Sequence, residues 1–256
     1  MGPAREGGTA DNSVEKNKKI MFNYLLKFKN FEKNFGFFAP FSAVCLVIFS
    51  CLAFYFILIS PTDYQQSNAV YIMYMHVPAA WMGLMIYTLM ALFNISGFIW
   101  KNPFFYLISR SIAPIGAMFT FLALVTGSIW GKPIWGTYWV WDARLTSMLI
   151  LLFLYIGYMI LVDAFDDREK SEKIAAIISI VGFINVPIIK FSVEYFNSLH
   201  QPASVFRKGG VAIDPAMLTP LLVTFAAFFS YFVFFSLIKV KTKIMQNKLV
   251  RNKIVR

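Results

Sequence analysis

The chain has 256 residues, of which 58% are hydrophobic and only 14% are charged, and its formal net charge is +11. Its mean hydropathy of +0.62 argues against a soluble domain, because such a domain could not remove that much apolar surface from water. The apolar residues stand in long unbroken runs without the period-two alternation of a lipid-facing strand, which argues against a membrane β-barrel. The composition therefore predicts an all-α, polytopic membrane protein.

Six apolar runs are long enough to cross a bilayer, which takes about 20 helical residues. No charged residue lies between Lys33 and Asp63, and His76 is the only ionisable side chain besides tyrosine between Asp63 and Lys101. Spanning helices are predicted near residues 37–60, 77–99, 112–129, 147–162, 174–192 and 217–238. This membrane domain, residues 37–238, is preceded by a basic extension, residues 1–36, and followed by a basic tail, residues 239–256.

The distribution of lysine and arginine predicts the orientation, since cytoplasmic flanks carry an excess of them. Of the 24 basic residues, 19 fall on the side of the membrane that holds both termini. The other five are Lys132, Arg144, Lys190, Arg207 and Lys208. Both termini are therefore predicted to be cytoplasmic, in a bacterial inner membrane or a mitochondrial inner membrane. The basic termini fit anionic lipid headgroups better than nucleic acid.

The outer face is predicted to receive three loops, residues 61–76, 130–146 and 196–216. The second loop reads WGKPIWGTYWVWDARLT and holds four of the six tryptophans. An aromatic belt at the membrane interface is the simpler explanation. The clustering in one loop shaped by Gly131, Pro133 and Gly136 instead favours a rigid platform for a broad planar ligand. Arg144 and Lys132 are then candidates to meet carboxylates at the edge of that ligand.

The only two histidines, His76 and His200, both fall at the predicted outer boundary, and each has a proline two positions later. Taken singly, each is as consistent with a structural role as with a ligand. Two imidazoles on either side of an aromatic platform are what axial ligation of a porphyrin iron requires.

Other roles for the histidines have weaker support. A zinc site normally takes three or four ligands, and the outer carboxylates of Asp63, Asp142, Glu194 and Asp214 lack compact spacing. A proton relay would need ionisable groups at mid-membrane. The nearest are Lys190 and Glu194, whose i,i+4 spacing predicts a mutual pair.

Residues 135–146, WGTYWVWDARLT, resemble the tryptophan-rich WWD signature of haem-handling proteins. With six helices and one outer histidine on each side of the motif, residues 40–238 resemble the haem exporter protein C (CcmC) family of cytochrome c maturation. The resemblance implies non-covalent haem b with His76 and His200 as axial iron ligands. The other haem-binding residues that it implies are Trp130, Trp135, Tyr138, Trp139, Trp141, Asp142 and Arg144. The implied partners are the haem chaperone CcmE, the ABC-transporter subunits CcmA and CcmB, and the small membrane protein CcmD.

Two further function classes stay open. A haem or solute channel would need polar groups along a path, and Asn94, Ser96, Thr126 and Asn185 are isolated enough to serve helix–helix hydrogen bonds instead. A structural subunit scaffolding an ABC transporter is the other class. The chain has no Walker motif, so any ATP hydrolysis must come from a partner. The two cysteines, Cys45 and Cys51, are about 9 Å apart along one helix and cannot pair.

Overall fold

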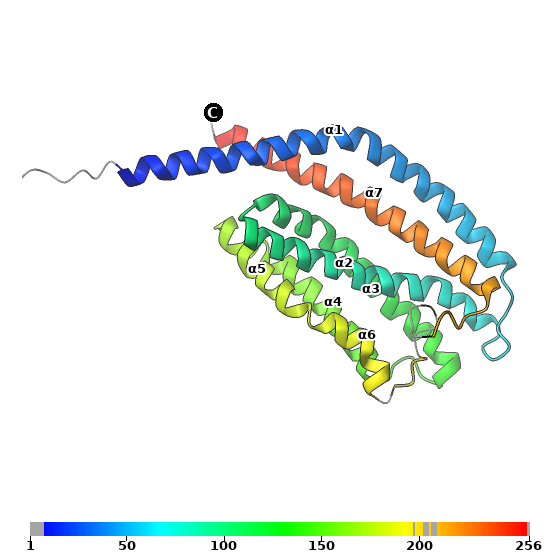
Figure 1. The fold of residues 1–256 in the computed structure, drawn as a ribbon. Helices are drawn as coiled ribbons and strands as arrows, with labels where there is room; N and C mark the ends of the chain where they lie inside the picture. Colours follow the sequence, from blue (N-terminus) through cyan, green and yellow to red (C-terminus); the bar gives the residue numbers. More distant parts are fainter. Residues whose placement is uncertain (1–7, 197, 202–204, 206–208, 255–256) are drawn as a thin grey trace, which may run out of the picture.

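The computed structural model describes the backbone of residues 8–196, 198–201, 205 and 209–254, and the side chains of those between 31 and 249. Every regular element in this part of the chain is a helix (Figure 1). In chain order the helices are α1 (Gly8–Ile59), the 3-10 helix η1 (Asn68–Ile72), α2 (Met73–Trp100), α3 (Pro103–Trp135), α4 (Ala143–Leu161), α5 (Arg168–Gly182), α6 (Asn185–Tyr195) and α7 (Pro215–Ile254).

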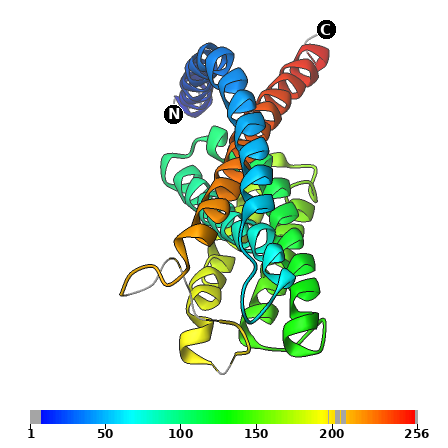
Figure 2. The same cartoon turned by 90° about the vertical axis from the view of Figure 1, so that its right-hand side faces the viewer.

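Within the described residues, six stretches are long and apolar enough to cross a membrane: 31–59, 68–100, 103–135, 143–161, 168–195 and 215–249. The predicted all-α fold with six membrane-crossing helices is thereby confirmed. Successive spans run in opposite directions. Both described ends of the chain lie at one end of the molecule with the turns after α2 and α4 (Figures 1 and 2). The connections after α1, α3 and α6 lie at the opposite end.

The first and last helices pack along each other beside the bundle formed by α2 to α6 (Figure 1). Only 11% of the most apolar stretch of α1 is buried within the protein, against 44% for the span that contains α2, so α1 is peripheral. Both helices run beyond their predicted spans, because α1 begins at Gly8 and α7 continues to Ile254. An ion pair between Lys248 Nζ and Glu32 Oε1, 2.8 Å apart, joins their extensions.

The fifth span is broken, whereas the hydropathy pattern predicted one helix over residues 174–192. Helix α5 ends at Gly182 and α6 begins at Asn185. The cause is Pro187, which has no amide hydrogen to donate to the carbonyl of Phe183 and whose ring crowds that carbonyl. The Phe183 oxygen instead accepts from the Val186 amide at 3.0 Å, in a tighter turn. The break lets α6 adopt its own direction at the end of the bundle that holds the candidate site.

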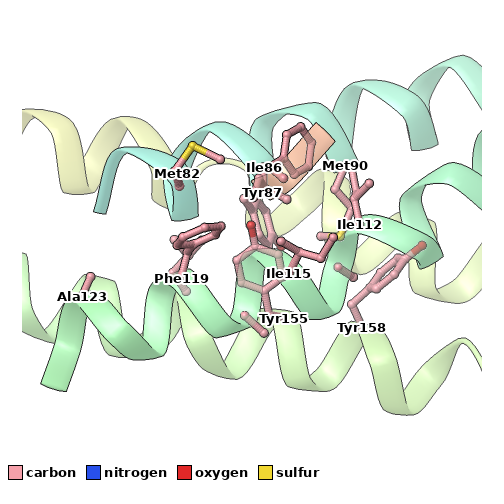
Figure 3. Packing of buried hydrophobic residues seen from close by; sticks show 14 of the residues in the cluster. Met82, Ile86, Tyr87, Met90, Ile112, Ile115, Phe119, Ala123, Tyr155 and Tyr158 are labelled. Atoms are coloured by element: carbon pink, nitrogen blue, oxygen red, sulfur yellow. The ribbon is translucent and has the colours of Figure 1, made fainter. Parts of the chain in front are cut away.

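Aromatic rings interlock the centre of the bundle (Figure 3). The Tyr155 hydroxyl donates to the Gly83 carbonyl at 2.8 Å, and the Tyr155 ring meets the Tyr87 ring edge to face with centroids 4.9 Å apart. A Cβ at Gly116 would collide with the Tyr155 hydroxyl, and one at Gly182 with the Tyr87 hydroxyl. Glycine at these two positions is what allows the helices to close around buried tyrosines.

Both asparagines among the four isolated polar residues form hydrogen bonds between helices. Asn94 Nδ2 donates to Ser179 Oγ at 2.5 Å, and Asn185 Nδ2 donates to the Ser147 carbonyl at 2.8 Å. The Ser96 hydroxyl donates instead to a carbonyl of its own helix. In these three positions the polar groups are engaged in the packing, which weakens the channel hypothesis.

Candidate ligand-binding site

A cavity of about 330 Å³ lies at the end of the bundle away from the termini. Helices α2, α3, α4, α6 and α7 all contribute to its wall. Ligand pockets typically measure about 300–1,000 Å³, so this cavity can hold part of a planar macrocycle. His76 and His200 both line it, although they are far apart in the sequence, and so do Trp130, Trp135 and Arg144.

His76 lies in the first turn of α2, and its imidazole contacts α3. Its Nδ1 lies 2.9 Å from the Ala123 carbonyl oxygen and 3.3 Å from Thr126 Oγ1. Because a carbonyl oxygen can only accept, Nδ1 carries the proton and Nε2 carries the lone pair that a metal needs. A Cβ at Gly127 would come within 2.7 Å of the imidazole Cε1. Glycine is therefore required for the ring to lie where it does.

His200 is held by a carboxylate. Its Nδ1 lies 3.3 Å from Asp142 Oδ2, and the same oxygen accepts from Ser198 Oγ at 2.5 Å. Asp142 is also the N-cap of α4, where Oδ1 accepts from the Leu145 amide at 2.8 Å. Burial opposes ionisation of Asp142, but these hydrogen bonds outweigh it and hold its pKa below the usual value. Burial also lowers the pKa of His200, so the pair is a neutral imidazole donating to a carboxylate.

One tryptophan accompanies each histidine. The Trp130 ring meets the His76 ring at a centroid distance of 5.6 Å, and the Trp135 ring meets the His200 ring at 4.9 Å, both edge to face. These tryptophans lie on the last turns of α3 and not in a loop, so the predicted loop of residues 130–146 is too long. Only residues 136–142 are non-helical. Gly136, with φ of 76°, ends α3 in the left-handed conformation.

The remaining aromatic residues of the motif lie outside the cavity. The Trp139 and Trp141 rings meet edge to face with centroids 5.5 Å apart, and Trp141 is 75% exposed. Tyr138 is 58% exposed, with Lys132 Nζ 5.2 Å from its ring centre. The predicted single platform is therefore two features: a wall made by Trp130 and Trp135, and an exposed aromatic group made by Tyr138 and Trp141.

Two cationic side chains, Arg144 and Lys190, line the cavity. Arg144 Nε donates to Ser192 Oγ at 3.3 Å, and Nη2 lies 3.5 Å from the Lys190 carbonyl oxygen. These contacts place the guanidinium beside α6. Lys132, which was predicted together with Arg144 to meet a carboxylate, donates to the Gly136 carbonyl at 3.0 Å. Arg207 and Lys208 lie outside the described residues.

The site contains residues that the sequence did not single out. Gly127 and Ser198 hold the histidines as described above. Gln66 also lines the cavity and accepts from Trp130 Nε1 at 2.9 Å. Among the described residues no group of three or more His, Cys, Asp or Glu side chains could hold a metal ion, so the zinc alternative gains no support. The expected pairing of Lys190 with Glu194 stays a prediction.

Comparison with known proteins identifies the family of this chain. The model of a protein family described as Heme exporter protein C, CcmC, matches residues 21–255. The chain belongs to the CcmC family. A haem exporter protein C from Bradyrhizobium diazoefficiens is 46% identical over 209 residues, which cover 82% of this chain and 80% of the relative. The Escherichia coli K12 protein of that name is 48% identical over 187 residues, 73% of this chain and 75% of its own length.

The family also has mitochondrial members. A ccmC-like mitochondrial protein of cytochrome c biosynthesis from Marchantia polymorpha is 50% identical over 171 residues, covering 67% of this chain and 72% of the relative. The names of these relatives connect CcmC proteins with haem export and with cytochrome c biosynthesis. Family membership and the six apolar helices together identify a multi-pass membrane protein.

Proposed function

We propose that this protein binds haem non-covalently at the outer face of the membrane and presents it to the haem chaperone CcmE for covalent attachment during c-type cytochrome biogenesis. The observation that carries the proposal is that the chain's only two histidines line the same cavity, one on α2 and one after α6. Imidazole is a common axial ligand of haem iron, and two of them complete its coordination. Haem b is the form that fits non-covalent binding.

The surroundings of the two imidazoles suit iron ligation. In each ring Nδ1 faces an oxygen acceptor, the Ala123 carbonyl for His76 and the Asp142 carboxylate for His200. Such acceptors fix the tautomer and orientation of a ligating histidine and raise its basicity, while Nε2 stays available for iron. Trp130 and Trp135 then provide flat apolar faces for the porphyrin.

The cations of the cavity suit the haem propionates. Arg144 is positioned by Ser192 and by the Lys190 carbonyl, and Lys190 is a second cationic residue of the cavity wall. A guanidinium can bind a carboxylate through two parallel hydrogen bonds, and an ammonium adds a point charge. Both cations lie on one wall, which favours a haem whose propionates face α4 and α6.

The exposed aromatic group offers a surface for presentation. Trp141 and Tyr138 are largely exposed beside the wall that carries Trp130 and Trp135. Aromatic side chains are enriched at the centres of protein interfaces. CcmE is the partner that we assign to this face, and CcmA, CcmB and CcmD are the further partners of the assembly.

The orientation rests on charge. One end of the molecule holds the turns after α2 and α4, and it carries Lys101, Arg110, Arg168, Lys170 and Lys173. Most basic residues of the chain belong to this side. By the positive-inside rule it faces the cytoplasm, which puts the cavity on the opposite, periplasmic side of a bacterial inner membrane. In a mitochondrion the corresponding face is the intermembrane side.

The absorption spectrum of the detergent-purified protein tests the ligand assignment. Wild type is compared with His76→Ala, His200→Ala, the double variant and Trp100→Ala, which removes an exposed ring at the opposite end of the molecule. A Soret band with low-spin features should collapse in all three histidine variants and persist in Trp100→Ala. Haem that survives in both single histidine variants would overturn the assignment, and purified protein without haem under any condition would favour the scaffold subunit.

A further inference from the structure

The connection between α1 and α2 reaches the cavity through one side chain, Gln66. Its amide oxygen Oε1 accepts a hydrogen bond from Trp130 Nε1 at 2.9 Å, across 64 positions in the sequence. The same Trp130 ring meets the His76 imidazole edge to face at 5.6 Å with an interplanar angle of 66°. Gln66 is thus one hydrogen bond and one ring contact away from His76.

The backbone on either side of Gln66 is fixed by local hydrogen bonds. Asp63 Oδ1 accepts from the amides of Gln65 at 2.9 Å and Gln66 at 2.8 Å, which forms an Asx turn. The Ser67 amide donates to the Asp63 carbonyl at 2.9 Å, and Ser67 has φ of 48°, a conformation that residues other than glycine rarely adopt. A turn held in this way presents the Gln66 side chain in one direction.

The base of the connection is anchored to the start of α2. The Tyr71 hydroxyl donates to the Ser60 carbonyl at 3.1 Å, and Ser60 Oγ is hydrogen bonded to the hydroxyl of Tyr74. Tyr74 is fully buried and stands two residues before His76. Hydrogen bonds therefore connect the segment that carries Gln66 with the helix that carries His76.

We infer that Gln66 is a positioning residue for His76: its amide oxygen holds the Trp130 indole, and the indole edge sets the orientation of the imidazole in the cavity. This inference rests on the proposed function, because the orientation of the His76 imidazole matters only if that imidazole binds the haem iron. The indole N–H needs an acceptor since the ring is half-buried beside the cavity. Without the Gln66 oxygen, Trp130 can turn toward solvent, and His76 loses its contact with the indole ring.

The first arm of the test uses ligand-free protein in detergent with 15N-labelled tryptophan. The Trp130 indole N–H resonance, identified by its loss in Trp130→Phe, is compared in wild type, Gln66→Leu, Gln66→Glu and Gln65→Leu. Gln65 is the matched control, since it neighbours Gln66 but is exposed. The resonance should shift and exchange faster with solvent only in Gln66→Leu, because Glu keeps an oxygen acceptor. An unchanged resonance in Gln66→Leu would refute the inference whether or not haem binds.

The second arm measures haem retention and the low-spin ferric EPR spectrum of the same variants with His76→Ala alongside. Gln66→Leu should lower retention roughly threefold to tenfold and broaden the low-spin signal, somewhat less than the ~10–100-fold typical of a direct partner of a ligand. Gln66→Glu should restore both, and Gln65→Leu should match wild type. Haem loss in His76→Ala together with wild-type behaviour of Gln66→Leu would overturn the positioning role and leave the proposed function standing. Haem retained in His76→Ala would instead overturn the assignment of His76 as an iron ligand, on which the proposed mode of haem binding rests.

Discussion

The two imidazoles that line the cavity are held by different acceptors. His76 faces a main-chain carbonyl within a helix, and His200 faces the carboxylate of Asp142, which Ser198 also contacts. A carboxylate acceptor makes an imidazole more basic than a carbonyl does, so His200 is expected to be the stronger electron donor of the two. The orientation of the His76 ring depends more on packing, because Gly127 and Trp130 confine it.

Replacing Gly127 by alanine tests that confinement. The added Cβ would lie 2.7 Å from the His76 Cε1, so the imidazole must move. We expect Gly127→Ala to lower haem retention at least ~10-fold, as loss of a direct partner does, while the helical content by circular dichroism stays the same.

Gly157 is the matched control, since it also lies inside a helix but a Cβ there would meet nothing within 4 Å. Gly157→Ala should keep its haem and gain up to about 1 kcal/mol of helix stability. Equal haem retention in the two alanine variants would show that the His76 ring does not depend on Gly127.

The sequence predicted several of the residues that line the cavity but missed the residues that support them. His76, His200 and Arg144 could be predicted because histidine is rare in this chain and arginine is unusual at an outer helix end. Gln66 and Gly127 could not be predicted, since their role depends on contacts with residues about 50 or more positions away. The signal of Trp139 and Trp141 was ambiguous, because tryptophan density alone does not say which rings face a cavity.

One N-cap residue connects the start of a helix with the site. Asp142 begins α4 through Oδ1 and holds His200 through Oδ2. Asparagine caps helices about as well as aspartate, but its amide nitrogen cannot accept from an imidazole N–H. Asp142→Asn should therefore leave the free energy of unfolding within ~0.5 kcal/mol of wild type and lower haem retention roughly 10-fold.

Asp167 provides the comparison, because it caps α5 at the other end of the molecule by accepting from the Glu169 and Lys170 amides. Asp167→Asn should change neither thermal unfolding nor haem retention. A loss of haem in Asp167→Asn as large as that in Asp142→Asn would point to a general defect in folding.

Hydropathy predicted the six spans but not where their helices end. Gly131 and Pro133 favoured a loop after residue 129, yet α3 continues to Trp135. The glycine has a packing role there, since a Cβ at Gly131 would lie 2.7 Å from the Trp135 ring. The break between α5 and α6 did have a signal in Pro187, which the continuous apolar run concealed.

The two ends of the molecule differ in charge and in chemistry. Basic residues gather at the end with the termini, and the cavity lies at the opposite end. The rigid tyrosine and glycine packing between them fixes the helix ends that meet at the cavity. This separation predicts that the site and the termini lie on opposite sides of the membrane.

Cysteine labelling in sealed spheroplasts checks the orientation. In a background with Cys45→Ala and Cys51→Ala, an impermeant thiol reagent should label Gln65→Cys from outside. It should label Lys101→Cys, which ends α2 at the other end, only after the membrane is opened. The reverse pattern would place the cavity on the cytoplasmic side and contradict the proposed presentation to a periplasmic partner.

Histidine ligation of the iron can be detected by electron–nuclear double resonance of the ferric haem-loaded protein with 15N-labelled histidine, purified without a histidine tag. Because the chain has only two histidines, every strongly coupled histidine nitrogen is assignable. We expect two strongly coupled histidine nitrogens on the iron in wild type. A wild-type spectrum with one histidine nitrogen, or none, would contradict two-sided ligation in this cavity.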